Sequence, residues 1–110
     1  MVEQQSSLDP IFKALADPAR RSILAQLSDG PASIGDLAAP LDISFAGTSK
    51  HVGILVSAQL VQKEKVGRRQ VCSLNPQPLA EIRDWLDRYA VFWTARLDEL
   101  EAAVGRYDDE

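Results

Sequence analysis

Basic and small polar side chains are concentrated between residues 44 and 70, and their chemistry is that of phosphate binding. Lys and Arg residues outnumber the single acid of this stretch, Glu64, and give it a net charge of +4. Ammonium and guanidinium groups pair with nucleic-acid phosphates, and hydroxyl groups reach phosphates or base edges. The stretch therefore indicates a nucleic-acid interface, although a solvated surface hairpin would carry the same charges. Its basic residues are Lys50, Lys63, Lys65, Arg68 and Arg69.

The charges outside this stretch are mostly acidic. The chain of 110 residues has a formal net charge of −4, with −3 on residues 1–43 and −5 on residues 71–110. An acidic total does not exclude DNA as a partner, because affinity depends on the local face that meets the phosphates. With 45% hydrophobic and 25% charged residues, the composition is that of an ordinary globular domain with a modest core.

Three features of the sequence predict the cytoplasm as its location. No run of about 18 apolar residues is present, so we expect no membrane partner. The first ten residues, MVEQQSSLDP, lack the basic start and apolar centre of a secretory signal. The single cysteine, Cys72, cannot form a disulfide within the chain, and one cysteine fits a reducing compartment.

Two consecutive helices are predicted to position the first half of the basic stretch. Ser33 is expected to cap a short helix that Pro40 ends, and residues 40–43 form a turn. Ser44 then caps a second helix that extends to about Ala58. A short helix, a turn and a helix with an exposed N-terminal half are the parts of a helix-turn-helix. An ordinary helical hairpin in an α-rich core is the alternative.

A hairpin is predicted to position the second half. Strands at residues 60–66 and 70–74 are joined through Gly67-Arg68-Arg69, which suits a tight turn that presents charge. A basic hairpin directly after the second helix would serve as a wing beside it. The order of the elements therefore favours a DNA-binding unit over an ordinary helical hairpin.

The remaining elements complete a mainly α fold with a small β-hairpin, of the α+β class. Apolar residues from Leu8 to Leu15 follow a helical spacing, and Asp17-Pro18 starts a second helix that Gly30-Pro31 ends. A long last helix is predicted at residues 79–104. The expected order is α-α-α-α-β-β-α in a single winged helix-turn-helix domain over residues 1–110. Its parts are the helix-turn-helix at 33–58, the wing at 60–74 and a C-terminal dimerisation helix at 79–104.

Several motifs in this order resemble the ArsR-like winged-helix repressors of bacteria, over roughly residues 8–104. The resemblance implies a homodimer paired through its first and last helices, with two recognition helices on a two-fold-symmetric operator. The motifs are ALADPARRSIL at 14–24, Ser49-Lys50-His51 within ISFAGTSKHVGIL, Leu60-Val61 followed by a basic strand to Lys65, GRRQVCSLNPQPL at 67–79, and FWTARLDELE at 92–101.

The last helix supports the dimer on physical grounds. Its aromatic and aliphatic residues present more apolar surface than one short domain can cover, and leaving them exposed would cost many kcal/mol at ~25 cal/mol per Å². The alternative is that they all pack on their own domain. The residues expected at the dimer interface are Leu8, Ile11, Phe12, Trp85, Tyr89, Phe92, Trp93, Leu97 and Leu100.

The chain also departs from the family pattern. Ala46-Gly47 stands where Pro-Ala is usual, and Thr48 replaces an apolar residue at the start of the recognition helix. Gln59 occupies a helix end where these repressors usually place Gly, and Cys72 a position where Tyr is common. These differences bear on base preference and local stability and leave the DNA-binding logic intact.

Metal sensing, the best-known activity of the family, has little support in the residues. Zinc sites need several Cys, His or carboxylate ligands, whereas the chain has one Cys, one His and no Cys-x-Cys pair in its third helix. We therefore expect no metal site and no cofactor, and we interpret Cys72 as a small buried hydrophobe rather than a redox centre. No nucleophile motif or phosphate loop is present, so the chain is not expected to be an enzyme.

The leading hypothesis is a dimeric, sequence-specific transcriptional regulator, with repression as its expected mode. The alternative is a winged-helix protein-interaction module that has lost DNA binding. A small organic effector, oxidation and the absence of any effector are all open as releasing signals. The residues expected to face the major groove are Ser44, Phe45, Thr48, Ser49, Lys50 and His51, although Thr48 also falls on the inward side of its helix. Those expected to serve the wing are Lys63, Lys65, Arg68 and Arg69.

Overall fold

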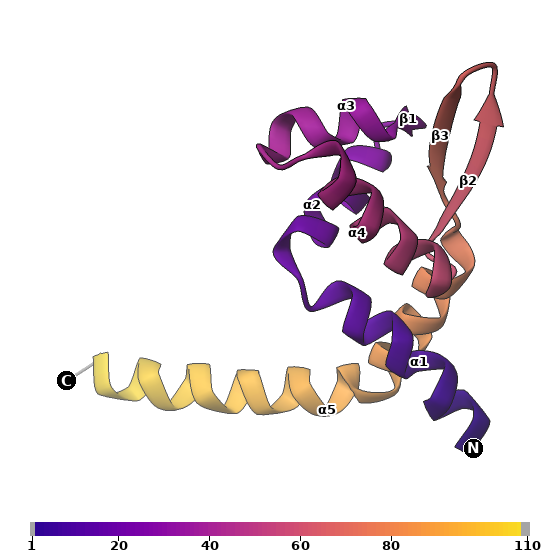
Figure 1. Ribbon diagram of the computed structural model, residues 1–110. Coiled ribbons are helices and arrows are strands. Elements are labelled where there is room, and N and C mark those ends of the chain that lie inside the picture. Colours follow the sequence, from indigo (N-terminus) through magenta and orange to yellow (C-terminus); the bar gives the residue numbers. More distant parts are fainter. Residues whose placement is uncertain (1, 109–110) are drawn as a thin grey trace. The chain divides into compact units, whose positions relative to one another are not determined.

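Helices make up most of the chain, with a small antiparallel sheet in its first three quarters (Figure 1). The computed structural model describes residues 2–108, with side chains for residues 8–105. It has two compact units, Met1–Leu79 and Ala80–Glu110, where the sequence predicts a single domain. The elements are α1 (Val2–Leu15), α2 (Pro18–Leu27), β1 (Ala32–Ser33), α3 (Ile34–Ala38), the 3-10 turn η1 (Ala39–Leu41), α4 (Phe45–Ser57), β2 (Val61–Val66), β3 (Arg69–Leu74) and α5 (Pro76–Asp108).

Three helices of the first unit, α2, α3 and α4, begin at the capping residues that the sequence predicts. Asp17 Oδ1 accepts a hydrogen bond from the Ala19 backbone N–H at 2.8 Å. Ser33 Oγ accepts from the backbone N–H of Asp36 at 3.2 Å, and Ser44 Oγ from that of Gly47 at 2.9 Å. Each cap satisfies a backbone donor that the first turn of a helix leaves without a partner.

Backbone geometry departs from the prediction in the turn before α4 and agrees with it after α4. The predicted turn at 40–43 is partly the 3-10 turn η1, and Asp42 closes it in the left-handed conformation with φ 54°. Gln59 takes the left-handed position expected at the end of α4, with φ 63°. Left-handed backbone is uncommon outside Gly, so both residues carry a small conformational cost.

The sheet has three strands in the order β1-β3-β2, one more than predicted. The strand that the sequence does not predict is β1. It has only two residues and pairs Ser33 with Val71 of β3. Val66 pairs with Arg69, so the hairpin turn is Gly67-Arg68 alone and Arg69 belongs to β3. A two-residue turn with a positive φ at its first residue (63° at Gly67) is the arrangement that glycine favours at that place.

The core of the first unit lies where α4 packs against α1, α2, α3 and β2. Each large side chain buried there contributes about 1.5–3 kcal/mol relative to exposure. Because α4 supplies three buried residues of its own, its orientation is determined by the core. The largest fully buried side chains are Ile23, Leu37, Thr48, Val52, Leu55, Leu60, Val61 and Cys72.

The helices at the two ends of the chain are longer than predicted. The backbone of α1 is helical from Val2, although the apolar helical spacing in the sequence begins only at Leu8. Helix α5 begins at Pro76 rather than residue 79 because Asn75 Oδ1 accepts from the Gln77 N–H at 3.4 Å and proline fits a first helical turn. Within residues 2–108, none of the helices combines the length and apolarity required for a membrane crossing.

Candidate DNA interface

The N-terminal half of α4 presents a mixed polar and apolar surface to solvent. Phe45, the first residue of the helix, is 61% exposed, and Lys50 is exposed one and a half turns further on. Ser49 and His51 are half-buried beside them. The exposed Ser44 uses its hydroxyl to cap the helix. These five residues, expected at the major groove, therefore lie at or near the surface.

Thr48 is a correction to the expected DNA contacts. Its side chain is fully buried, with 0% exposure, and its Oγ1 donates to the Ser44 carbonyl at 2.9 Å. One helical turn separates the two residues, so the hydroxyl is satisfied within the helix itself. A side chain without accessible surface does not touch a base or phosphate, and Thr48 belongs to the core.

The wing presents its basic side chains in three directions. Lys63 and Lys65 lie two residues apart and so share one face of the hairpin. Arg68 stands at the tip and is exposed. Arg69 pairs with Val66, the neighbour of Lys65, and adjacent residues of a strand point to opposite faces. Arg69 therefore lies on the face opposite Lys65. The four basic residues of the wing therefore do not form one continuous face.

Arg69 is engaged by the first turn of α3. Its guanidinium donates to Ser33 Oγ at 2.7 Å and to Asp36 Oδ2 at 3.0 Å. The Arg69–Asp36 ion pair is about two-thirds exposed, so its contribution to folding is at most about 1 kcal/mol. The ion pair has a clearer effect on the charge that the wing presents, because the Asp36 carboxylate 3.0 Å away locally neutralises the Arg69 guanidinium. Arg69 thus ties the wing to α3 and, as it stands, offers little net charge to a phosphate.

A groove of about 330 Å³ separates the wing from the start of α4. Phe45 and Arg68 border it from opposite elements, so the tip of the wing and the first residue of the recognition helix open onto the same hollow. The residues that line it are Ser33, Ile34, Gly35, Asp36, Phe45, Arg68, Arg69 and Gln70.

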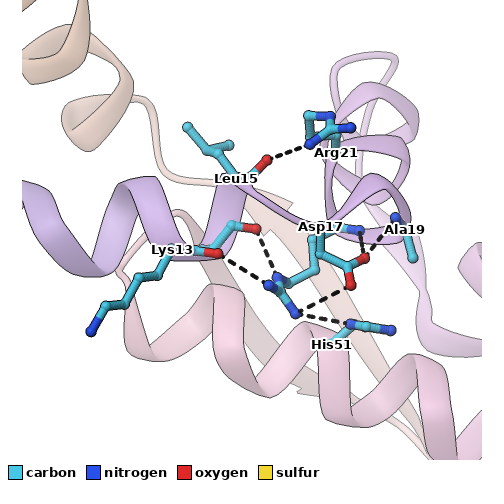
Figure 2. Close-up of polar contacts among 8 residues, drawn as sticks. Lys13, Leu15, Asp17, Ala19, Arg21 and His51 are labelled. Carbon is cyan, nitrogen blue, oxygen red and sulfur yellow. Dashed lines mark hydrogen bonds and ion pairs between the residues drawn. The ribbon is translucent and has the colours of Figure 1, made fainter.

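Arg20, which the sequence pattern does not place at any site, contacts α4 through the ring of His51, which Figure 2 labels. Its Nε donates to the Ala14 carbonyl at 2.7 Å and its Nη2 to the Lys13 carbonyl at 3.1 Å. Its Nη1 lies 3.3 Å from His51 Nδ1 and 3.9 Å from Asp17 Oδ2. Arg20 thereby joins the end of α1, the cap of α2 and the outer face of α4. The only feature of the sequence that marks Arg20 is its place in the pair of arginines after Asp17-Pro18.

Two titratable groups in the first unit have shifted pKa values. Desolvation tends to raise the pKa of Asp17, but the backbone N–H groups of Arg20 and Ala19 and the Arg20 guanidinium outweigh it and lower the pKa. Burial raises the pKa of the Cys72 thiol, and nearby Lys63 offsets part of that effect. The cap of α2 is therefore an ionised carboxylate at neutral pH, and Cys72 is a protonated thiol.

The donor set of the described residues does not fit a metal site. No three His, Cys, Asp or Glu side chains gather there in an arrangement that could hold a metal ion. Cys72 is fully buried in the sheet, and His51 Nδ1 already faces Arg20. Zinc needs several such ligands converging on one point. No step of the function is therefore assigned to a metal.

Of the nine residues expected at a dimer interface, Ile11 is a correction. It is only 3% exposed within its own chain, so its side chain has no surface left for a second copy. On α1, Phe12 is exposed and Leu8 half-buried. On α5, Trp85 is half-buried and the other five are exposed: Tyr89, Phe92, Trp93, Leu97 and Leu100.

Comparisons with known proteins agree with this geometry. A family model described as a helix-turn-helix domain matches residues 15–64. The HTH-type transcriptional regulator Rv2034 of Mycobacterium tuberculosis is 42% identical over 104 residues, which are 94% of either chain. A crystal structure of an ArsR family transcriptional regulator superposes with a TM-score of 0.75 at 34% identity, over 82% of this chain and 93% of the other.

The chain belongs to the ArsR-like family of winged helix-turn-helix transcriptional regulators. The resemblance seen in the sequence motifs is thereby confirmed. The transcriptional repressor SdpR of Bacillus subtilis, another relative, is 34% identical over 79 residues, which are 72% of this chain and 88% of SdpR. As an ArsR-like regulator, the chain is a DNA-binding transcriptional regulator and not an enzyme, and an interaction module without DNA binding is not favoured.

Proposed function

We propose that this ArsR-like regulator binds a two-fold-symmetric operator as a homodimer and represses transcription by covering a promoter, in the cytoplasm where DNA is accessible. The observation that carries the proposal is the shared groove, since exposed Phe45 of α4 and exposed Arg68 of the wing border one hollow. A recognition helix in the major groove and a wing tip on the adjacent backbone would use both sides of it.

The proposed roles of the individual side chains follow from their exposure and from the contacts that they already make inside the chain. Lys50, Lys63, Lys65 and Arg68 are exposed and would meet phosphates, which supplies affinity for any sequence. Ser44, Ser49 and His51 would donate to phosphates or base edges near the start of α4. Phe45 is apolar and 61% exposed, and the methyl group of a thymine is the apolar partner that a major groove offers.

The proposed dimer rests on the apolar face of α5. Trp93, Leu97 and Leu100 follow one another at spacings of four and three residues, which places them on one side of the helix, and each is 59–62% exposed. Burying such side chains against a second copy would contribute about 1.5–3 kcal/mol each. Phe12 and Leu8 of α1 would add to the interface.

The test is a selection of double-stranded DNA from a random pool with the wild-type chain. The proposal predicts an enriched site with two inverted half-sites about one helical turn apart, because a symmetric dimer places two copies of α4 at that spacing. Enrichment of a single unrepeated half-site would contradict the symmetric dimer. A Leu97→Glu variant should sediment as a monomer and lose the enrichment, and Glu99→Gln, a change of an exposed polar residue on the same helix, is the matched control.

A further inference from the structure

We propose that Arg20 is a positioning residue that holds the ring of His51 in the tautomer with its proton on Nε2, so that Nε2–H serves as a hydrogen-bond donor to DNA. The DNA part of this inference rests on the proposed function. The tautomer part concerns the free protein alone.

The orientation of Arg20 is determined by its own bonds. Nε and Nη2 donate to the carbonyls of Ala14 and Lys13 in the last turn of α1, at 2.7 and 3.1 Å. Both carbonyls lie at the end of α1. That of Lys13 also accepts from the Ala16 amide at 3.3 Å, so the guanidinium adds a second donor there and supplies one to Ala14. The side chain is only 13% exposed. The third nitrogen, Nη1, is thereby directed to a defined place between Asp17 and His51.

The contact with His51 has only one consistent proton arrangement. A guanidinium has five N–H donors and no acceptor, and it stays charged at all accessible pH values. At 3.3 Å from Arg20 Nη1, the Nδ1 atom of His51 must therefore accept, which requires a lone pair on Nδ1. A neutral imidazole with a bare Nδ1 carries its proton on Nε2. The doubly protonated ring has no acceptor and would oppose Arg20 with a like charge.

The consequence for the α4 face is a defined donor. Within residues 2–108, the structure gives Nε2 of His51 no hydrogen-bond partner, and the ring is half-buried on the same helix as exposed Lys50. Phosphate oxygens, and the N7 and O6 atoms of guanine, only accept. A ring held with its proton on Nε2 thus matches the acceptors that DNA presents, whereas a ring with a bare Nε2 would repel them. Asp17, 3.9 Å from Arg20 Nη1, balances the charge of the guanidinium.

The chain offers a matched control for Arg20. Arg21 follows it on α2 and also caps α1, with Nη1 donating to the Leu15 carbonyl at 2.8 Å, and among the described residues no hydrogen bond joins it to His51. Arg20→Lys and Arg21→Lys therefore remove the same guanidinium chemistry from neighbouring positions. Only the first of them removes the donor from His51 Nδ1.

The first experiment is nitrogen-15 NMR of the imidazole ring at about pH 8, on protein without a histidine tag. The chain has a single histidine, so the ring signals need no assignment between residues. The expected spectrum has a protonated Nε2 and an unprotonated Nδ1 in a single tautomer. Arg20→Lys should show a tautomer mixture, and Arg21→Lys the wild-type spectrum. A proton on Nδ1 in the wild type, or an Arg20→Lys spectrum identical to the wild type, overturns the inference.

The second experiment measures binding to the selected DNA site. In His51→Gln the amide NH2 stands near the position of Nε2 and keeps a donor, whereas the shorter His51→Asn does not reach it. We expect His51→Gln to bind within about threefold of the wild type and His51→Asn to bind roughly a hundredfold or more weakly, because each of the two copies in a dimer loses a hydrogen bond to a charged group at about tenfold each. Arg20→Lys should weaken binding more than Arg21→Lys.

The two experiments separate this inference from the proposed function. If the wild type binds no DNA while the ring shows only Nε2–H, the proposed function and the donor role of His51 are wrong, and Arg20 controls the tautomer for another reason. If the wild type binds DNA and His51→Asn binds as well as His51→Gln, the proposed function stands and the donor role is overturned. Equal losses in Arg20→Lys and Arg21→Lys likewise overturn the positioning role.

Discussion

Arg68 and Arg69 are neighbours in the wing, yet the structure predicts different effects of removing them. Arg68 is exposed at the tip, whereas Arg69 donates to Asp36 at 3.0 Å and to Ser33 at 2.7 Å. Arg68→Ala should weaken binding to every sequence, because a phosphate contact carries no base information. Arg69→Ala should have a much smaller effect, because its charge is already neutralised by Asp36.

The salt dependence gives the size of the difference. Each phosphate contact contributes about 0.9 to the slope of log affinity against log salt, and a dimer presents two copies of Arg68, so Arg68→Ala should reduce the slope by about 2. At about 1 kcal/mol for an exposed contact, the dimer loses about 2 kcal/mol, or roughly thirtyfold in Kd. Arg69→Ala should change the slope by less than half as much, and the double variant should resemble Arg68→Ala.

The assay is fluorescence anisotropy of a labelled operator between about 50 and 200 mM salt, the range over which such slopes are resolved. Asp36→Asn provides the converse test: it leaves Arg69 with its full charge, so affinity and slope should both rise. Thermal unfolding checks that each variant folds, since the exposed Arg69–Asp36 pair is worth at most about 1 kcal/mol. Equal losses of slope in the two single variants, or no loss in Arg68→Ala, would refute the reasoning.

Three further predictions address single side chains. The pKa of Asp17 in the folded chain lies below its ordinary value of 3.8, so the stabilising effect of the carboxylate is complete above that value and is lost as pH falls through the lower folded pKa. The difference in unfolding free energy between the wild type and Asp17→Asn, measured with urea, should therefore shrink from about pH 6 to pH 3. A constant difference would contradict this. Cys72 is fully buried with a raised pKa, so a thiol reagent should label it only as fast as the chain unfolds, and immediate labelling of folded protein would disprove its burial. Replacing thymine by uracil in the operator should weaken the wild type by about fourfold per half-site, at ~0.8 kcal/mol for a buried methyl, and leave Phe45→Ala unaffected; an equal response of both proteins would exclude Phe45 from thymine contact.

The parts of the fold that depend on neighbouring residues could be predicted from the sequence. Asp17, Ser33 and Ser44 cap their helices as expected, because a cap acts on backbone groups two or three residues away. The bounds of α4 follow for the same reason, whereas the hairpin turn is Gly67-Arg68 rather than the predicted Gly67-Arg68-Arg69. Strand β1 could not be predicted, since two residues carry no alternation and their pairing with β3 spans almost forty residues.

The parts of the site that depend on distant contacts were not predictable. The sequence shows Arg69 as a basic wing residue, but its role is set by Asp36, 33 residues earlier. Ile11 belongs to an amphipathic pattern, and such a pattern does not tell which apolar residues face the chain's own core. Thr48 carries a hydroxyl that resembles a DNA contact until its bond to the Ser44 carbonyl is known. The role of Arg20 depends on its contacts with two backbone carbonyls of α1 and with His51 of α4, which its sequence neighbours do not reveal.

The proposed function requires α4 and the wing of this regulator to bind DNA as a pair of symmetry-related copies. The most direct measurement is a titration of the folded wild-type chain against a labelled duplex from its own promoter region, at ~0.1 M salt. The predicted result is saturable binding with two chains per duplex, which unlabelled specific duplex displaces and unrelated DNA of the same length does not. No binding at micromolar dimer, with folding confirmed by circular dichroism, would contradict the claim.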